Sequence, residues 1–234
     1  MKMLACIDIG NTNIVIGLYN KNNLIKTYRI ETNVSELDKI NFSEFGNIAI
    51  SSVVPKITKK LEKYNPFIIT HKNSQINLKI DSAEEVGNDR IANIKATIKE
   101  YKLPAIIIDF GSATTYDIIN KNKEFIGGAI APGIDVSAKY LFKRAALLNQ
   151  VDFKFPKSVI GKNTTTNLQS GIMFGGIDAI NGMINRIKSE FNETIETLIL
   201  TGGFSETLSP EINHSHILDR ELTIKGIKYI WDDN

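Results

Sequence analysis

The sequence predicts an α/β fold made of two copies of one structural unit, and two observations support this prediction. An apolar strand runs into Asp8-Ile9-Gly10 at the start of the chain, and another runs into Asp109-Phe110-Gly111 in its middle. In each copy a second strand, an Asn-Lys turn and a third strand follow, and predicted strands alternate with predicted helices along the rest of the chain. We therefore expect two α/β halves, residues 1–104 and 105–234.

Apolar runs bounded by turn residues predict the remaining strands, and apolar residues at three- and four-residue steps predict the helices. Ile91, Ile94 and Ile98 show this helical spacing. The first half is expected to contain strands at 14–19, 24–29, 48–54 and 67–70, helices at 57–64 and 86–101, and a weakly patterned polar segment at 31–46. The second half is expected to contain strands at 105–110, 115–119, 124–130 and 197–200, helices at 135–148 and 168–191, a polar loop at 149–167, and a tail at 213–234 of short strands or loop.

Composition excludes several classes of protein. The chain has 234 residues and a net charge of +2 from 28 basic and 26 acidic residues, with no basic half or tail to follow nucleic acid. No apolar run reaches the ~18 residues that a membrane span needs. The single cysteine, Cys6, lies on the first predicted strand and is expected to be a small core residue. We expect a cytoplasmic protein that binds neither nucleic acid nor membrane.

The two Asp-x-Gly turns are suited to phosphate binding, because glycine lets backbone N–H groups approach an anion closely. Asp8 can hold a hydrated Mg²⁺ that a nucleotide carries. Thr201-Gly202-Gly203 follows a strand and can leave a flat gap for a nucleoside. Together these elements resemble the actin, Hsp70 and sugar-kinase superfamily, whose fold is a duplicated ribonuclease-H-like domain around a nucleotide cleft, with two phosphate loops and an adenosine loop.

The segment from Glu85 to Asn93 opens a predicted helix and places Asp89 beside Arg90 near its positive end. Capping of the helix by Asn88 or Asp89 is one interpretation. The other is a general base next to an arginine that binds an anion.

The chain resembles the type III pantothenate kinases, which phosphorylate pantothenate at the first step of coenzyme A synthesis. The matching segments occur in family order: Asp8–Thr12, Ser51–Pro55, Val86–Asn93, Asp109–Thr115, Gly127–Gly133, Gly161–Thr164 and Thr201–Gly203. The motif Gly87-Asn88-Asp89-Arg90 distinguishes this family from sugar kinases.

The resemblance implies a role for each matching residue. Asp89 would be the catalytic proton acceptor, and Asp109 would bind a monovalent cation, K⁺ or NH₄⁺. Pantothenate would be bound by Gly87, Asn88, Asp89, Arg90 and Thr164. ATP with Mg²⁺ would be bound by Asp8, Ile9, Gly10, Asn11, Thr12, Asn13, Ile14, Val15, Gly111, Ser112, Gly202 and Gly203. Family members are homodimers whose pantothenate pocket includes residues of the partner chain.

Two positions depart from the family pattern. Ile80 replaces a common tyrosine, and Ser112 replaces a threonine while keeping the hydroxyl. Gly171, Gly175 and Gly182 fall near one side of the long helix, where they indicate either a close helix contact at the dimer or crowding in the core. Two other functions stay open: a non-catalytic accessory factor of the same family, and an ATPase or phosphatase of the same superfamily.

Overall fold

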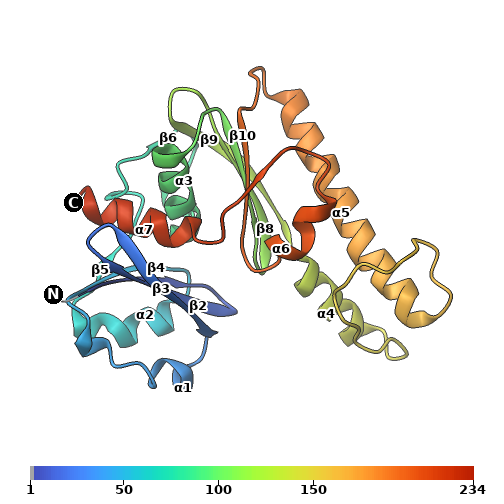
Figure 1. Cartoon of the computed structure of the whole chain (residues 1–234), viewed down its shortest axis with the longest axis horizontal. Helices are drawn as coiled ribbons and strands as arrows, with labels where there is room; N and C mark the ends of the chain where they lie inside the picture. The colour runs from blue at the N-terminus through green and yellow to red at the C-terminus, as the bar shows by residue number, and fades with distance from the viewer. Residues whose placement is uncertain (1–2) are drawn as a thin grey trace. The chain divides into compact units, whose positions relative to one another are not determined.

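The computed structural model describes residues 3–234, which divide into two compact units (Figure 1). The first unit contains the chain up to Leu103, together with Asp117–Gly127 and Glu221–Asn234. The second contains Pro104–Tyr116 and Gly128–Arg220. No helix within residues 3–234 is long and apolar enough to cross a membrane.

The first unit is built on a five-stranded sheet with the strand order β3-β2-β1-β4-β5. β1, β2 and β3 pair antiparallel, whereas β4 is parallel to β1 and β5 is parallel to β4. Its strands are β1 (Leu4–Ile9), β2 (Asn13–Asn20), β3 (Asn23–Glu31), β4 (Asn47–Ser52), β5 (Phe67–Ile68) and β6 (Asn77–Leu78). Its α-helices are α1 (Val34–Leu37), α2 (Pro55–Leu61), α3 (Asn88–Glu100) and α7 (Leu222–Asp232), with short 3-10 turns at Phe42–Glu44, Glu62–Tyr64 and Ala83–Glu85.

The second sheet repeats the first. Its order is β11-β10-β7-β8-β9-β6, so β9-β8-β7-β10-β11 matches β3-β2-β1-β4-β5, and β6 is added at one edge. Besides β6, this sheet contains β7 (Ala105–Phe110), β8 (Ala113–Ile119), β9 (Glu124–Pro132), β10 (Thr197–Thr201) and β11 (Ile217–Leu218). The helices of the second unit are α4 (Ile134–Arg144), α5 (Thr164–Glu190) and α6 (Ser205–Leu208), with a 3-10 turn at Ser209–Glu211. The predicted duplicated α/β fold is confirmed.

The two hairpin turns are closed in a similar way but differ in length by one residue. The Gly10 N–H donates to the Asn13 carbonyl, and the Gly111 N–H donates to the Ala113 carbonyl, each over 3.0 Å. The sequence repeat therefore corresponds to a repeat of local structure at the ends of β1 and β7.

The core of the first unit follows from alternation along β1. Ala5, Ile7 and Ile9 lie on one face of the sheet and cluster with Ile57 and Leu61 of α2, and all five are almost fully buried. Successive side chains of a strand point to opposite faces, so the other face must be covered by other helices.

The prediction for the tail is wrong for residues 222–232, which form the helix α7, whereas Ile217–Leu218 form the short strand β11. Leu222, Ile224, Ile227 and Ile230 are almost fully buried. β-Branched residues and a central glycine disfavour a helix locally, so tertiary packing decides its structure. The long helix also begins earlier than predicted, at Thr164, and α4 ends earlier, at Arg144.

α7 packs beside α3, the helix that carries the Asp89-Arg90 pair (Figure 1). A Cβ on Gly226 would lie 1.8 Å from the backbone carbonyl oxygen of Ala92, so only glycine allows this approach. The contact is extended by a hydrogen bond of 2.7 Å from the Thr223 hydroxyl to the Asn93 side chain. The Tyr229 hydroxyl donates to Glu100 over 2.6 Å. The C-terminal segment thus fixes the helix on which the candidate site is built.

Gly226→Ala should destabilise the protein despite the better helix propensity of alanine. The added methyl group meets backbone atoms that cannot rotate away, and overpacking costs about 1–3 kcal/mol. We expect the melting temperature to fall by roughly 4–8 °C, measured by calorimetry. Lys225→Ala is the control on the same helix, since it adds no atom against the α3 backbone; its partly exposed ion pair with Glu100 is worth at most about 1 kcal/mol. Equal melting temperatures for the two variants would contradict the packing argument.

Candidate active site

The first turn of α3 is attached to the end of β4. Gly87 is the N-cap residue and makes no side-chain capping bond. The Asn88 amide instead donates 3.1 Å to the backbone carbonyl of Ser52. Asn88 therefore does not cap the helix, and its side chain holds this turn against the first sheet.

The Asp89 carboxylate lies over the start of its own helix. Its Oδ1 accepts a hydrogen bond of 2.7 Å from the Arg90 backbone N–H. A Cβ at position 87 would lie 2.5 Å from this oxygen, so Gly87 leaves the space that the carboxylate occupies. Burial raises the pKa of Asp89 above the usual range of an aspartate, although the hydrogen bond and the charge of Arg90 oppose the shift. A carboxylate with a raised pKa is suited to accept a proton.

The Arg90 side chain turns away from Asp89 and pairs with Asp117 of β8. Asp117 Oδ1 accepts from Arg90 Nε over 2.9 Å and from Nη2 over 2.6 Å. The guanidinium carbon also lies 5.6 Å from the centre of the Phe125 ring on β9. Sequence analysis did not identify Asp117. A signal was present, since it is a carboxylate among the apolar residues of a predicted buried strand.

The end of β4 connects the candidate substrate motif to the first phosphate loop. Ser51 Oγ donates 3.0 Å to Asp8 Oδ1, and the next residue, Ser52, provides the carbonyl that binds Asn88. In the sequence the Ser51-Ser52 pair was a family match without a role. The structure shows that these two serines bring Asp8 and the Gly87–Arg90 turn to neighbouring positions.

Two hydrogen bonds from Thr32 fix the turn between β1 and β2. The Thr32 hydroxyl donates 2.7 Å to the Gly10 carbonyl, and its N–H donates 3.0 Å to the Thr12 carbonyl. These bonds engage two carbonyl groups of the loop, while the Asn11 and Thr12 residues are exposed. An anion can therefore approach this side of the turn without displacing the sheet.

The second loop and the Thr-Gly-Gly segment lie together in the second unit. Thr201 is in register with Asp109 on the neighbouring strand. Gly202 has a φ of +89°, and a Cβ there would lie 2.3 Å from Asp109 Oδ1. Gly202 must be glycine for both its dihedral and its close approach to the carboxylate. The Ser112 carbonyl accepts from the Gly133 N–H over 3.0 Å, which supports the loop from the other side.

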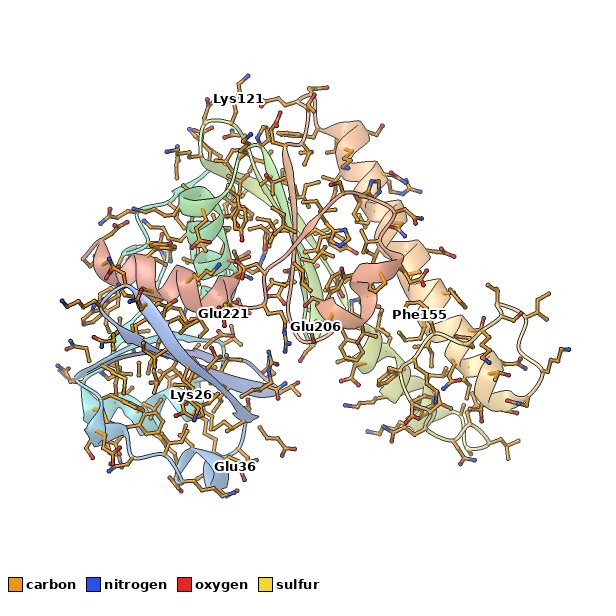
Figure 2. All side chains as sticks on the ribbon, viewed as in Figure 1. Lys26, Glu36, Lys121, Phe155, Glu206 and Glu221 are labelled. Atoms are coloured by element: carbon orange, nitrogen blue, oxygen red, sulfur yellow. The ribbon has the colours of Figure 1, made fainter. Side chains whose placement is uncertain are left out.

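Thr164 is the first residue of α5. Asn163 caps the helix: its side-chain oxygen accepts a hydrogen bond of 2.9 Å from the Thr166 N–H. In return, the Asn163 backbone N–H donates to the Thr166 hydroxyl over 3.3 Å. Thr164 lines a cavity of about 300 Å³. The other lining residues are Asn149, Gln150, Val151, Asp152, Lys154, Thr165, Leu168 and Gln169. The loop that forms this wall is held to α5 by Phe155, labelled in Figure 2, whose ring centre is 5.3 Å from that of Phe174.

The structure thus groups the predicted site residues by unit. Asp8–Val15 and Gly87–Arg90 belong to the first unit, where β4 connects them. Asp109, Gly111, Ser112, Gly202 and Gly203 gather in the second unit, and Thr164 lines its own cavity there. Ile80, at the position of the common tyrosine, is partly buried after β6.

Structural neighbours share the fold at low sequence identity. A Campylobacter jejuni structure described as a transcriptional activator of the Baf family aligns with a TM-score of 0.67 and 24% identity, covering 98% of both chains. An activator of 2-hydroxyisocaproyl-CoA dehydratase from Clostridium difficile, solved with ADPNP, aligns with a TM-score of 0.53 and 11% identity, covering 99% of this chain and 95% of that one. At these identities the likeness establishes the actin-like ATPase type of fold and no more.

Sequence relatives are more specific. A type III pantothenate kinase from Citrifermentans bemidjiense is 37% identical over 99% of this chain and 100% of its own length. The family model described as type III pantothenate kinase matches residues 4–186. Because the match spans most of the chain and includes both phosphate loops and the Gly87–Arg90 motif, this chain belongs to the type III pantothenate kinase family.

Proposed function

We propose that this chain transfers the γ-phosphoryl group of ATP to the primary hydroxyl of pantothenate, the first step of coenzyme A biosynthesis. The observation that carries the proposal is the first turn of α3, where the Asp89 carboxylate and the Arg90 guanidinium are fixed in different directions. That turn is tied to the strand end that also binds Asp8 of the first phosphate loop. Membership of the pantothenate kinase family supports the same substrate.

Each residue then has a defined role. Gly87–Arg90 and Thr164 bind pantothenate. As the hydroxyl oxygen attacks the γ-phosphorus, its proton passes to Asp89 and the bond to the leaving ADP breaks. Burial raises the pKa of Asp89, which improves its match to a proton acceptor near neutral pH.

In this proposal the residues that bind ATP are those that the family resemblance assigns: Asp8–Val15, Gly111, Ser112, Gly202 and Gly203. The carboxylate of Asp8 is oriented by the Ser51 hydroxyl and is a suitable oxygen ligand for hydrated Mg²⁺. Mg²⁺ would neutralise charge on the phosphates, while the loops hold them in line with the acceptor.

ADP release from MgATP with and without pantothenate tests the proposal. We expect release only when pantothenate is present. Asp89→Asn keeps the side-chain shape but cannot take the proton, so its turnover should fall by about 10²–10⁴. Glu85→Gln is the control, because it neutralises an exposed carboxylate near the same helix.

The same assay separates the alternatives. ADP release at the same rate with and without pantothenate would indicate an ATPase. No ADP release under any condition would indicate a non-catalytic relative. Near wild-type turnover of Asp89→Asn would remove this residue from the role of base.

The position of Asp109 supports a monovalent cation. Its carboxylate lies at the end of β7, packed against the Gly202 backbone, and no basic residue lies between it and Lys121 in the sequence. Close to ATP phosphates such a carboxylate meets like-charge repulsion, which a counter-ion relieves. Among residues 3–234 no group of three or more His, Cys, Asp or Glu side chains is arranged to hold a metal. A weakly hydrated ion, K⁺ or NH₄⁺, can be bound by one carboxylate together with backbone carbonyls.

Activity should therefore require K⁺ or NH₄⁺ and fall sharply in sodium buffer of equal ionic strength. Asp109→Ala should raise the KM for ATP more than the KM for pantothenate, because the cation lies on the phosphate side. Glu206→Ala is the control, since it removes an exposed carboxylate of the same unit, labelled in Figure 2. Full activity without K⁺, together with an unchanged ATP affinity in Asp109→Ala, would show that Asp109 binds no functional cation.

Exposed apolar residues of the second unit support a homodimer. Several large apolar side chains of this unit are exposed, among them Ile130, Val136, Tyr140, Leu141, Leu147, Val159 and Ile160. Leu141 also lines a groove formed by residues of β8, β9, α4 and α5. On α5, a Cβ at Gly171, Gly175 or Gly182 would have no neighbour within 4 Å. Crowding in the core therefore does not explain these glycines, whereas close approach of a second copy does.

Sedimentation at micromolar concentration should give a species of twice 26.1 kDa. Gly175→Leu adds bulk to the exposed face of α5 and should shift the protein to monomers with reduced turnover. Lys56→Leu adds the same side chain to exposed α2 in the first unit and should leave the dimer intact. A fully active wild-type monomer would contradict the dimer proposal.

A further inference from the structure

Asp117 is a buried carboxylate that pairs with Arg90 of the candidate substrate motif. Its exposure is 0%, and its neighbours along β8, Tyr116, Ile118 and Ile119, are buried apolar or aromatic residues. One oxygen, Oδ1, accepts both hydrogen bonds from Arg90. The other, Oδ2, is buried and accepts no hydrogen bond from the described residues.

This arrangement costs stability rather than supplying it. Burial raises the pKa of Asp117 to about 6 in spite of the Arg90 charge, so the fold disfavours the ionised form that pairs with the arginine. The sequence repeat leads to the same conclusion. Asn13 and Ala113 close the two hairpin turns, and Asn20 and Asn120 end the following strands, so Asp117 corresponds to Gly17. The repeat position therefore does not need a carboxylate to form its strand.

The pair does restrict the arginine strongly. Its guanidinium is held by Asp117 on β8 and lies against the Phe125 ring on β9. Arginine has five N–H donors, of which Asp117 engages Nε and one on Nη2. The side chain is 14% exposed, so its remaining donors can meet a ligand from one fixed direction.

The pair also separates two neighbours that could bind each other. Asp89 and Arg90 are adjacent and oppositely charged, and a direct ion pair would lower the pKa of Asp89 and occupy the base. With Arg90 paired to Asp117, the Asp89 carboxylate accepts hydrogen bonds from backbone N–H groups and keeps a raised pKa.

We propose that Asp117 is a positioning residue for phosphoryl transfer: it fixes the Arg90 guanidinium for the oxygen atoms of pantothenate and keeps it off the Asp89 carboxylate. This inference rests on the proposed function, because it takes Arg90 as a ligand of pantothenate and Asp89 as the base.

Asp117→Asn tests the proposal in the full-length protein. We expect the KM for pantothenate to rise about 10- to 100-fold, the size of a lost charge-assisted hydrogen bond, while the KM for ATP changes less than about twofold. The acid limb of the pH–rate profile should move to lower pH, because Asp89 loses a like charge in Asp117 and gains Arg90 as a partner. The melting temperature should stay within about 4 °C of wild type. Asp38→Asn, an exposed aspartate of the same unit, is the control and should behave as wild type.

A double-substitution cycle distinguishes positioning from a structural role. In the Arg90→Ala background, adding Asp117→Asn should change the KM for pantothenate less than about twofold, since the group through which Asp117 acts is gone. The proposal would be overturned if Asp117→Asn raised the KM for pantothenate by the same factor with and without Arg90. It would also be overturned if Asp117→Asn alone left this KM and the pH profile unchanged. If Asp117→Asn is recovered unfolded, Asp117→Ala takes its place, because it also removes the carboxylate that accepts from Arg90; a wild-type KM for pantothenate in that variant would overturn the proposal. Wild-type protein that releases no ADP in response to pantothenate would instead refute the proposed function.

Discussion

The first turn of α3 carries a carboxylate and a guanidinium on consecutive residues, so their directions depend on how this turn is fixed. Two interactions with neighbouring strands fix it: Asn88 donates to the Ser52 carbonyl of β4, and Arg90 donates to Asp117 of β8. A third comes from α7, which approaches α3 so closely that only glycine fits at position 226. The chemistry proposed for the site therefore depends on contacts with elements that are distant in the sequence.

The duplicated unit gives this protein two similar hairpins whose second strands make different contacts. Each turn closes with a hydrogen bond from a glycine N–H, to Asn13 in the first and to Ala113 in the second, and each follows a strand that carries an aspartate, Asp8 or Asp109. In the first copy the following strand has Gly17, which accommodates Ile224 of α7. In the second copy the corresponding residue is Asp117, which binds Arg90. The two copies thus share a backbone arrangement but differ at this one position. Glycine there allows Ile224 to pack in the first copy, and aspartate there pairs with Arg90 in the second.

Much of the fold could be predicted from the sequence because it is encoded locally. The repeated Asp-x-Gly turns and the period of the apolar residues give the strands, and the confirmed duplication follows from them. α7 could not be predicted, since its β-branched residues and Gly226 favour a helix only once it packs on α3. In the site, Asp89 and Arg90 are adjacent in the sequence and could be identified together. Asp117 stands out in the sequence as a carboxylate among apolar strand residues, but its pairing with Arg90 could not be predicted, because a whole element separates the helix from the strand along the chain.

In the proposed reaction, the fixed turn Gly87–Arg90 presents a base and an arginine to one substrate. A structure of the protein with pantothenate and a non-hydrolysable ATP analogue would test this arrangement. We expect the primary hydroxyl to lie within hydrogen-bond reach of Asp89, about 2.6–3.2 Å, with Arg90 still bound to Asp117 and donating to another oxygen of the same molecule. Pantothenate bound with its hydroxyl on a different carboxylate, or without contact to Arg90, would contradict it.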